Sequence, residues 1–263
     1  VDKYKKMAQR NGKLFSHQPF KWLMKRKWGK KFLFVFFGKK KDSLTNKKHF
    51  PSCFPYIKKT DQERCENMPW VLKDKTPFIV TEKCDGSSAT YILERKKFNR
   101  FEFYVCSRNV RQLKPSQECF YKENIYWHCA FNYNIEAKLQ DYLNKHPKLK
   151  YVCWQGEICG PNILKNPQGL SKYHLFCFHM IDSEKGMYDI REAQKIWDKY
   201  NMEHVSILNE NYIFPDDFEI FKNHAEGKYT SAVCEGQINK DREGLVYYKT
   251  TDYFIIKDEP NVE

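Results

Sequence analysis

Short hydrophobic stretches recur in the middle of the chain, with polar residues between them. Residues 78–82, 89–94 and 101–107 are rich in aromatic and β-branched side chains, and turn-like or charged stretches separate them. This pattern is typical of antiparallel strands. The same signature predicts four further strands, at residues 151–158, 174–181, 245–248 and 253–257.

Apolar side chains recur at helical spacing in two other segments. Residues 124–145 contain no proline or glycine and end before Pro147, and residues 190–200 repeat the spacing. Both segments are predicted to be helices. A short helix is also predicted near residues 60–67, within a connection interrupted by prolines that spans residues 50–77.

The composition is that of a globular protein. The chain has 263 residues, of which 41% are hydrophobic and 16% aromatic, which is ample for a packed core. Its longest apolar run, residues 32–37, is much shorter than the roughly 18 residues that a membrane-spanning helix needs. Ten cysteines are scattered along the chain without a Cys-X-X-Cys pair, which predicts reduced thiols and no structural zinc site. We expect a cytoplasmic, monomeric protein that does not enter a membrane.

Positive charge is concentrated at the N-terminal end. Residues 1–60 carry a balance of +16, whereas residues 61–263 carry −3. Aromatic residues are interleaved with the basic ones, a combination that suits phosphate neutralisation and base stacking on a polynucleotide. The predicted nucleic-acid-binding side chains are Lys25, Arg26, Lys27, Lys30, Lys31, Lys39, Lys40 and Lys41. The alternative is a solvated lysine-rich face around a strand at residues 32–37.

A lysine lies at a tight turn between two predicted strands. Residues 78–88 read Phe-Ile-Val-Thr-Glu-Lys-Cys-Asp-Gly-Ser-Ser, so Lys83 follows the first strand directly. Gly86 permits a close approach of the backbone to a ligand. A lysine attacks only as the neutral amine, so covalent chemistry requires a cationic neighbourhood or desolvation. Alone, Lys-X-Asp-Gly also fits an ordinary turn without chemistry.

Four later stretches carry side chains that a nucleotide bound to Lys83 would need. Arg108 follows a predicted strand and offers a guanidinium to a phosphate or sugar. Glu157 lies between two glycines at a strand end, where its carboxylate suits ribose hydroxyls. Glu243, in the sequence Glu-Gly-Leu-Val, suits a divalent metal or the orientation of the lysine. Lys257 could neutralise phosphate and favour the neutral amine of Lys83 by like-charge repulsion.

These five stretches occur in the order that is found in the covalent nucleotidyltransferase superfamily, and the chain resembles that superfamily of polynucleotide ligases and messenger RNA capping enzymes. The resemblance extends over about 175 residues, from Lys83 to Lys257. Glu82 before the lysine and the two serines after the Asp-Gly pair look like the RNA ligase 2 family and its phage relatives. Capping enzymes and ATP-dependent DNA ligases usually carry an arginine where this chain has Ser88.

The resemblance implies a role for each matched residue. Lys83 would be the adenylated nucleophile, and Glu243 would bind metal and orient the lysine. An aromatic residue of the strand that begins at position 174 would stack on adenine; Phe178 is preferred to Phe176 because the family pattern has an aspartate four residues later, here Asp182. The other residues expected to contact the nucleotide are Glu82, Asp85, Ser88, Arg108 and Glu157.

Two positions depart from the family pattern. The final motif normally has two lysines spaced Lys-X-Lys, but Ile255 occupies the first of these positions. Lys257 would therefore act alone, or Lys249 would supply the missing charge. Ser88 stands where the best-known members have asparagine, so the hydrogen-bonding group is shorter there.

The resemblance implies an α+β nucleotidyltransferase fold, with two antiparallel sheets, the nucleotide between them and helices outside. A basic N-terminal module, residues 1–60, would precede the adenylation domain, residues 61–263. Because the sequence ends six residues after Lys257, without the C-terminal domain of many ligases, the basic segment is expected to grip the polynucleotide.

The implied activity is that of an ATP-dependent ligase, expected to act on RNA, that joins 5′-phosphate and 3′-hydroxyl ends through lysyl-AMP. Mg²⁺ or Mn²⁺ would offset phosphate charge in each step. Two alternatives remain. One is a capping-type guanylyltransferase, which Ser88 disfavours, and the other is a nucleic-acid-binding protein with a decayed site, for which Ile255 is the argument.

Overall fold

The computed structural model describes most of the chain beyond residue 61. It covers residues 62–115, 124–230, 232–235 and 240–250, with the backbone of residues 255–258. Nearer the N-terminus it describes residues 22, 23, 25, 26 and 57. The chain divides into two compact units, Val1–Lys47 and Lys48–Glu263, and every element below belongs to the second. The strand predicted at residues 32–37 lies outside the described residues, and the boundary near residue 60 stays a prediction.

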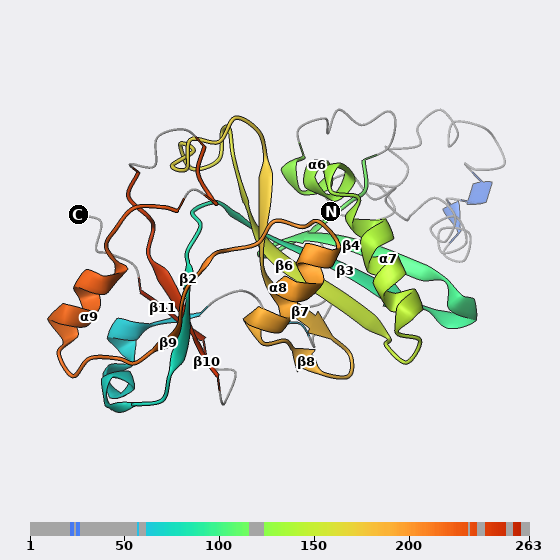
Figure 1. Cartoon of the computed structure of the whole chain (residues 1–263). Coiled ribbons are helices and arrows are strands. Elements are labelled where there is room, and N and C mark those ends of the chain that lie inside the picture. Colours follow the sequence, from blue (N-terminus) through green and yellow to red (C-terminus); the bar gives the residue numbers. More distant parts are fainter. Residues whose placement is uncertain are drawn as a thin grey trace. The chain divides into compact units, whose positions relative to one another are not determined.

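One sheet of the second unit has five strands, in the order β1-β11-β10-β2-β9 (Figure 1). Neighbouring strands are antiparallel, except that β1 and β11 are parallel. The strands are β1 Glu63–Arg64, β2 Phe78–Glu82, β9 Ile207–Tyr212, β10 Leu245–Lys249 and β11 Ile255–Asp258. All five residues of β2 are buried, because β2 lies inside the sheet between β10 and β9. Its last residue is Glu82, so the sheet places Lys83 at the end of an internal strand.

The second sheet has six antiparallel strands, in the order β5-β4-β3-β6-β7-β8. They are β3 Ser87–Arg95, β4 Phe101–Ser107, β5 Arg111–Gln112, β6 Tyr151–Cys159, β7 His174–Asp182 and β8 Gly186–Met187. Because β2 belongs to the first sheet and β3 to the second, the turn that contains Lys83 connects the two sheets.

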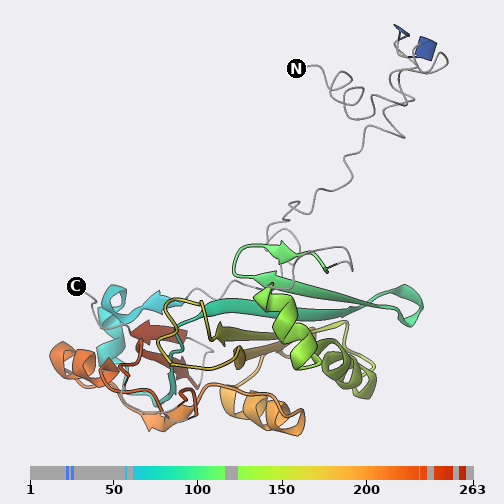
Figure 2. The same ribbon diagram turned by 90° about the horizontal axis from the view of Figure 1, so that it is seen from above.

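The helices lie outside the two sheets, as predicted (Figures 1 and 2). Three of them, α6, α7 and α8, cover the six-stranded sheet, and α9 lies beside the five-stranded one. Their bounds are α6 Ile125–Asn132, α7 Ile135–Lys145, α8 Ile190–Lys199 and α9 Phe218–Ala225. Short 3-10 turns occur at η1 Cys65–Asn67, η2 Pro69–Lys73 and η3 Lys97–Asn99. No helix in the described ranges is long and apolar enough to span a bilayer.

Separate hydrophobic clusters stabilise the two sheets. Trp154 of β6 and Trp197 of α8 are fully buried in the cluster between the six-stranded sheet and its helices. Phe78 of β2 packs edge-on against Phe214, and both lie in the cluster of the five-stranded sheet. Full burial of each such aromatic contributes about 1.5–3 kcal/mol. Both ends of the β2–β3 connection are therefore anchored in packed layers.

The predicted α+β fold with antiparallel sheets is confirmed, but the elements differ locally from the prediction. Residues 124–145 form two helices, because Asn134 adopts a left-handed φ of 49° that ends the helical run between α6 and α7. The short helix predicted near residues 60–67 is instead strand β1 followed by the turn η1. Strand β9 was not predicted; its four central residues are exposed, so the sequence carries no alternation there.

Candidate active site

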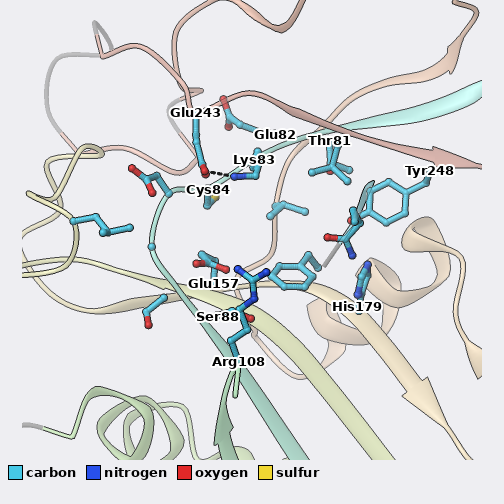
Figure 3. Close-up of a pocket in the computed structure, with 18 residues that line it drawn as sticks. Thr81, Glu82, Lys83, Cys84, Ser88, Arg108, Glu157, His179, Glu243 and Tyr248 are labelled. Atoms are coloured by element: carbon cyan, nitrogen blue, oxygen red, sulfur yellow. Dashed lines mark hydrogen bonds and ion pairs between the residues drawn. The ribbon is translucent and has the colours of Figure 1, made fainter. Parts of the chain in front are cut away.

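A cavity of about 380 Å³ is lined by residues of both sheets (Figure 3). It brings together most of the predicted site residues, which come from segments more than 150 residues apart in the sequence. The predicted residues that line it are Glu82, Lys83, Asp85, Ser88, Arg108, Glu157, Phe178 and Glu243. Four of the five sequence stretches therefore converge on one site, together with Phe178 of β7. The fifth, which contains Lys257, is discussed below.

Lys83 is held at this site through both its backbone and its side chain. Its backbone N–H donates to the carbonyl of Gly244 at 3.1 Å, which continues the pairing of β2 with β10. Its ammonium forms an ion pair with the carboxylate of Glu243, and both side chains are partly buried. The predicted orienting contact between Glu243 and the lysine is thus present in the structure.

The glycine of this turn serves the protein's own packing. A Cβ atom at Gly86 would overlap the carbonyl oxygen of Ile158 and lie 2.8 Å from Cys159 Sγ. The sequence predicted that Gly86 lets the backbone approach a ligand. The structure shows that it lets the turn approach strand β6, which fixes Lys83 beside Glu157.

Glu82 has a role that the sequence did not predict. Its side chain is 1% exposed, and its two carboxylate oxygens accept hydrogen bonds from Thr230, one from the backbone N–H at 2.9 Å and one from Oγ1 at 2.7 Å. Burial raises the pKa of Glu82, which the bonds from Thr230 oppose. Glu82 lines the cavity, but its hydrogen bonds with Thr230 hold the end of β2 in place. These bonds give no support to the predicted contact between Glu82 and the nucleotide.

Glu157 and Ser88 lie directly opposite each other on β6 and β3, and Arg108 follows the end of β4 on the same side of the cavity (Figure 3). Burial and the negative charge of Glu243 raise the pKa of Glu157 to about 8, although Lys83 and Arg108 act in the opposite direction. Burial is thus the main reason that the folded protein favours the protonated form of Glu157, and the nearby carboxylate of Glu243 adds to it.

The raised pKa of Glu157 makes protein stability depend on pH. From the ordinary pKa of 4.5 up to about 8, the folded protein keeps a proton that the unfolded chain has released, so folding becomes less favourable as the pH rises through this window. Each unit of pKa difference corresponds to about 1.4 kcal/mol of unfolding free energy. Glu157→Gln should therefore raise the melting temperature more at pH 9 than at pH 5, as measured by thermal unfolding of both proteins.

The matched control is Glu226→Gln, because the side chain of Glu226 is exposed and does not line the cavity. Its melting temperature should differ from that of the wild type by the same small amount at both pH values. An equal effect of Glu157→Gln at pH 5 and pH 9 would contradict a raised pKa of Glu157.

The structure brings Phe178, and not Phe176, to the cavity. The pairing of β6 with β7 shifts its register between Gln155 and Gly156, which face His179 and Cys177, so that Phe178 is the extra residue of a β-bulge. Phe178 is partly buried and lines the cavity. Phe176 is 2% exposed and stacks on His174 in the core. The preference for Phe178 as the aromatic residue next to the base agrees with this geometry.

The two C-terminal lysines differ in position. Lys249 does not line the cavity; its ammonium binds the carboxylate of Asp74 at 2.9 Å, and the pKa of Asp74 is lowered to about 2, mainly by its hydrogen bond from Thr76 and with a further contribution from Lys249. The structure thus pairs Lys249 with Asp74 rather than with a cavity residue, and the suggestion that it replaces the charge missing at Ile255 stays a prediction. Lys257 pairs in register with Val246, a cavity residue, but its side chain lies outside the described residues.

Several lining residues were not predicted. They are Gln62, Thr81, Cys84, Ser87, Leu164, His179, Val205, Val246 and Tyr248. Val246 and Tyr248 occupy alternate positions of β10, so both lie on the face of the strand that lines the cavity. Strand alternation counted onward from that motif could have identified both.

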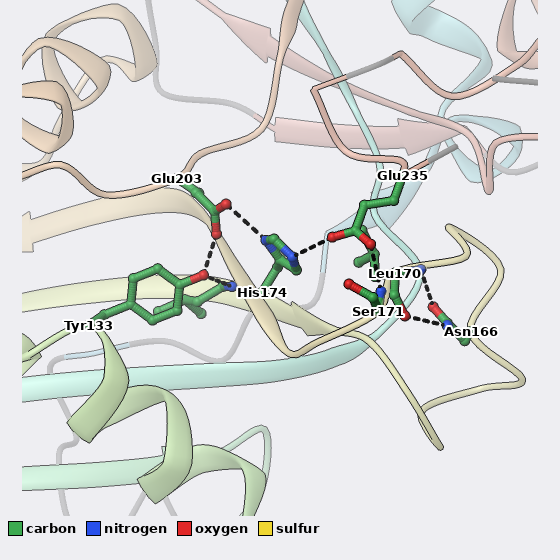
Figure 4. Close-up of polar contacts among 8 residues, drawn as sticks. Tyr133, Asn166, Leu170, Ser171, His174, Glu203 and Glu235 are labelled. Carbon is green, nitrogen blue, oxygen red and sulfur yellow. Dashed lines mark hydrogen bonds and ion pairs between the residues drawn. The ribbon is translucent and has the colours of Figure 1, made fainter. Parts of the chain in front are cut away.

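A hydrogen-bonded network next to the cavity fixes the segment between β6 and β7 (Figure 4). His174 contacts the carboxylates of Glu203, at 2.8 Å from Nδ1, and Glu235, at 3.3 Å from Nε2, and the hydrogen bond to Glu203 raises the pKa of His174. Glu235 also accepts from the backbone N–H of Ser171 at 2.8 Å. In the same segment, Gln168 donates to the carbonyl of Asp85 at 3.1 Å. The bond from Gln168 thus ties this segment to the turn that carries Lys83.

Only two of the predicted nucleic-acid-binding residues are described, Lys25 and Arg26, and both are exposed. The guanidinium of Arg26 lies 4.5 Å from the centre of the Trp22 ring, a cation–π contact of the kind that interleaved basic and aromatic residues permit. The remaining predicted residues lie outside the described residues: Lys27, Lys30, Lys31, Lys39, Lys40 and Lys41.

Comparison with known protein families gives one match, to the RNA ligase model, over residues 76–259. This chain belongs to the RNA ligase family. The matched range contains every predicted residue of the nucleotide site, from Glu82 to Lys257, and the predicted family resemblance is confirmed. No curated protein matched the sequence.

The fold is similar to solved structures of an RNA ligase from Naegleria gruberi. A variant of that ligase with AMP and Mn is 29% identical to this chain with a TM-score of 0.65, covering 81% of this chain and 58% of the ligase. A variant with ATP and Mn is 27% identical with the same TM-score, covering 81% and 57%. The ligase with PPi is 27% identical, covers 87% and 65%, and also has a TM-score of 0.65. This chain therefore spans less than two thirds of the ligase that it matches.

Proposed function

We propose that this chain is an ATP-dependent RNA ligase that works through a lysyl-AMP intermediate on Lys83. The main support is the convergence of four separate sequence stretches on one cavity, with Lys83 paired to Glu243 and placed beside Glu157 and Arg108. Membership of the RNA ligase family supports the same activity, and the related Naegleria structures contain ATP, AMP or PPi.

The proposed reaction has three displacements at phosphorus. After the Lys83 ammonium loses a proton, Nζ attacks the α-phosphorus of ATP; a P–N bond forms, the bond to the β-phosphate oxygen breaks, and pyrophosphate leaves. An oxygen of the RNA 5′-phosphate then attacks the same phosphorus and releases the lysine. Finally the 3′-hydroxyl attacks the 5′-phosphate, and AMP leaves. In this scheme Arg108 binds a phosphate or the ribose, and Glu157 contacts the ribose.

The carboxylates of the cavity fit a divalent metal ion. In the described part of the chain no three acidic, histidine or cysteine side chains form a preassembled metal site, which agrees with the way Mg²⁺ binds through one or two carboxylates, water and substrate phosphates. Glu243 would hold the ion, with Glu157 nearby; the repulsion that raises the pKa of Glu157 is what a cation would relieve. Bound Mg²⁺ or Mn²⁺ would neutralise phosphate charge during transfer.

The proposed function is tested by incubating the full chain with α-labelled ATP or GTP and separating the products by denaturing electrophoresis. A labelled protein band with ATP alone supports the ligase, and joining of a 5′-phosphorylated RNA strand to a 3′-hydroxyl end completes the test. A band with GTP alone would instead support a capping-type guanylyltransferase. The absence of a band with either nucleotide would support a nucleic-acid-binding protein with a decayed site.

The basic N-terminal segment is proposed to hold the polynucleotide. Removing residues 1–48 should leave self-adenylation nearly unchanged, because Lys83 and its partners lie downstream, but should sharply reduce end joining. Each phosphate that a basic residue neutralises contributes about −0.7 to the slope of log affinity against log salt. If four to six basic residues of the segment bind phosphates, raising the salt from 50 to 200 mM should lower the affinity for the polynucleotide roughly 50- to 300-fold. The truncated protein should show a much flatter slope in filter-binding titrations.

An unchanged salt slope in a soluble truncated protein would exclude this role for the segment. Loss of self-adenylation together with insolubility would indicate that residues 32–37 belong to the catalytic core.

A further inference from the structure

The hairpin formed by β3 and β4 ends in a turn that carries an exposed aromatic side chain. Phe98 is 89% exposed, more than any other large hydrophobic residue that the structure describes. In Figures 1 and 2 the hairpin extends past helix α7, and none of the hydrophobic clusters of the described residues includes Phe98. Core packing therefore does not explain the phenyl ring.

The backbone of the turn does not favour a phenylalanine either. Phe98 is left-handed, with a φ of 60° and a ψ of 33°, and Asn99 follows with a φ of 53°. Two successive left-handed residues are the geometry of tight hairpin turns, which prefer Asn-Gly and Asp-Gly. Asparagine suits such a conformation, whereas a bulky residue is rarely found in it. Local folding thus gives no reason for an aromatic side chain at this position.

Basic side chains flank the ring. Lys97 and Arg100 are exposed, and among the residues that the structure describes neither side chain has an ion-pair partner. The neighbouring Lys96 pairs with two carboxylates, those of Glu94 at 2.5 Å and Glu102 at 3.6 Å. The acidic residues of the hairpin are therefore matched by Lys96, and the end of the hairpin keeps two positive charges beside the ring.

Further basic residues lie between the hairpin turn and the cavity. Arg108 lines the cavity, and Arg111 lies farther along the sheet, with its guanidinium 4.3 Å from the centre of the Tyr104 ring. Tyr104 points to the same face of the sheet as the cavity residue Ser88, because its register partner on β3 lies four residues from Ser88. The ammonium of Lys96 lies 5.9 Å from the same ring. Basic side chains thus follow this face from the cavity to the hairpin turn.

A single-stranded polynucleotide matches these features. Lysine and arginine neutralise its phosphates, and exposed aromatic rings stack on its bases without a sequence preference. Because β3 has nine residues, the hairpin turn is about 27 Å from the cavity, at roughly 3.4 Å per residue. A stacked strand covers that length with about eight nucleotides, at roughly 3.4 Å each. A ligand that reaches both places is therefore longer than the nucleotide bound at Lys83.

We propose that the turn between β3 and β4 is a second RNA-binding site. Phe98 stacks on a base about eight nucleotides from the reacting end, and Lys97 and Arg100 bind neighbouring phosphates. This inference rests on the proposed ligase activity, which places the 5′-phosphate end of the RNA at Lys83. Because the turn binds only the distant part of the strand, it makes the protein prefer long RNA ends to short ones.

Equilibrium binding of a single-stranded RNA of about 20 nucleotides, long enough to span cavity and turn, tests the site without depending on catalysis. Fluorescence anisotropy with the full chain should show a dissociation constant at least about 5-fold higher for Phe98→Ala, because one base stack is lost. Phe98→Trp should bind like the wild type, whereas Phe98→Leu, which is apolar but not aromatic, should bind as weakly as Phe98→Ala. The matched control is Phe131→Ala, which removes a phenylalanine that is 57% exposed on α6 and should leave the affinity unchanged.

The charges of the turn are tested by salt dependence. Each phosphate that a basic residue neutralises contributes about −0.7 to the slope of log affinity against log salt, so combining Lys97→Gln with Arg100→Gln should make the slope less negative by about 1.4. An unchanged slope in this double variant would contradict phosphate binding at the turn.

Transfer of AMP from the protein to 5′-phosphorylated RNA adds a test of length. At RNA concentrations below saturation, Phe98→Ala should slow transfer to the long RNA by about the factor seen in binding, but should not slow transfer to a trinucleotide, which is too short to reach the turn from the cavity. An equal loss with both RNAs would overturn the proposal, because the effect would then arise at the cavity.

An unchanged affinity of Phe98→Ala for the long RNA would also overturn the proposal and would leave the exposed ring to a protein partner. Failure of the proposed function is distinguished by the labelled-ATP experiment. If no labelled band forms but Phe98→Ala still weakens RNA binding, the RNA site stands and the ligase chemistry does not.

Discussion

Replacing Lys83 by alanine should abolish covalent attachment of AMP to the protein while leaving the fold intact. The lysine is only partly buried, its ammonium pairs with Glu243 on the cavity wall, and the hydrophobic clusters of both sheets do not include it. Loss of the side chain therefore removes the nucleophile without removing core packing. The measurement is denaturing electrophoresis after incubation with α-labelled ATP, with thermal unfolding of the same sample to confirm folding.

Two further variants sharpen this test. Lys145→Ala removes an exposed lysine that pairs with Asp141 on α7, and it should label like the wild type. Lys83→Arg keeps the positive charge but should not label, because a guanidinium stays protonated and cannot attack phosphorus. A stable AMP adduct on Lys83→Ala would place the nucleophile at another residue and remove the central support for a ligase.

Much of the fold could be predicted because strand periodicity is a local property. Strands β2 and β4 begin and end where the residue types predicted, since both carry aromatic and β-branched residues between clear turn signals. The candidate site was predictable for a different reason. Lys83, Glu157 and Glu243 lie at or within two residues of a strand end, and each has a glycine within three residues, so short motifs identify them without any knowledge of the contacts between them.

The features that could not be predicted depend on contacts between distant segments. The Glu82 carboxylate binds Thr230, 148 residues later, and Lys249 binds Asp74, 175 residues earlier; local sequence does not show either partner. The break at Asn134 depends on a single left-handed residue in an otherwise helical pattern. The β-bulge at Phe178 also escapes strand alternation, because its register shift is set by the neighbouring strand β6.

Replacing Glu243 by glutamine should slow adenylation of Lys83 by about 100- to 1,000-fold, the range for removal of one preorganised electrostatic contact to a transition state. The variant keeps the shape of the side chain but removes the charge that pairs with Lys83 and that is proposed to bind the metal ion. The apparent KM for ATP should change little, because these contacts serve the reacting atoms rather than the ground-state complex. Glu157→Gln is the contrasting variant: it should chiefly raise the apparent KM, because Glu157 is proposed to contact ribose.

The coupling between these two carboxylates gives a second measurement on the same variant. The charge of Glu243 is the second cause, after burial, of the raised pKa of Glu157, so Glu243→Gln should lower that pKa towards its ordinary value. The window in which stability falls with rising pH should then end below pH 8 in thermal unfolding experiments. An unchanged window would show that the charge of Glu243 does not contribute to the raised pKa of Glu157. If Glu243→Gln raised only the apparent KM for ATP and left the maximal rate intact, Glu243 would be a nucleotide-binding residue and its assignment to lysine and metal would be wrong.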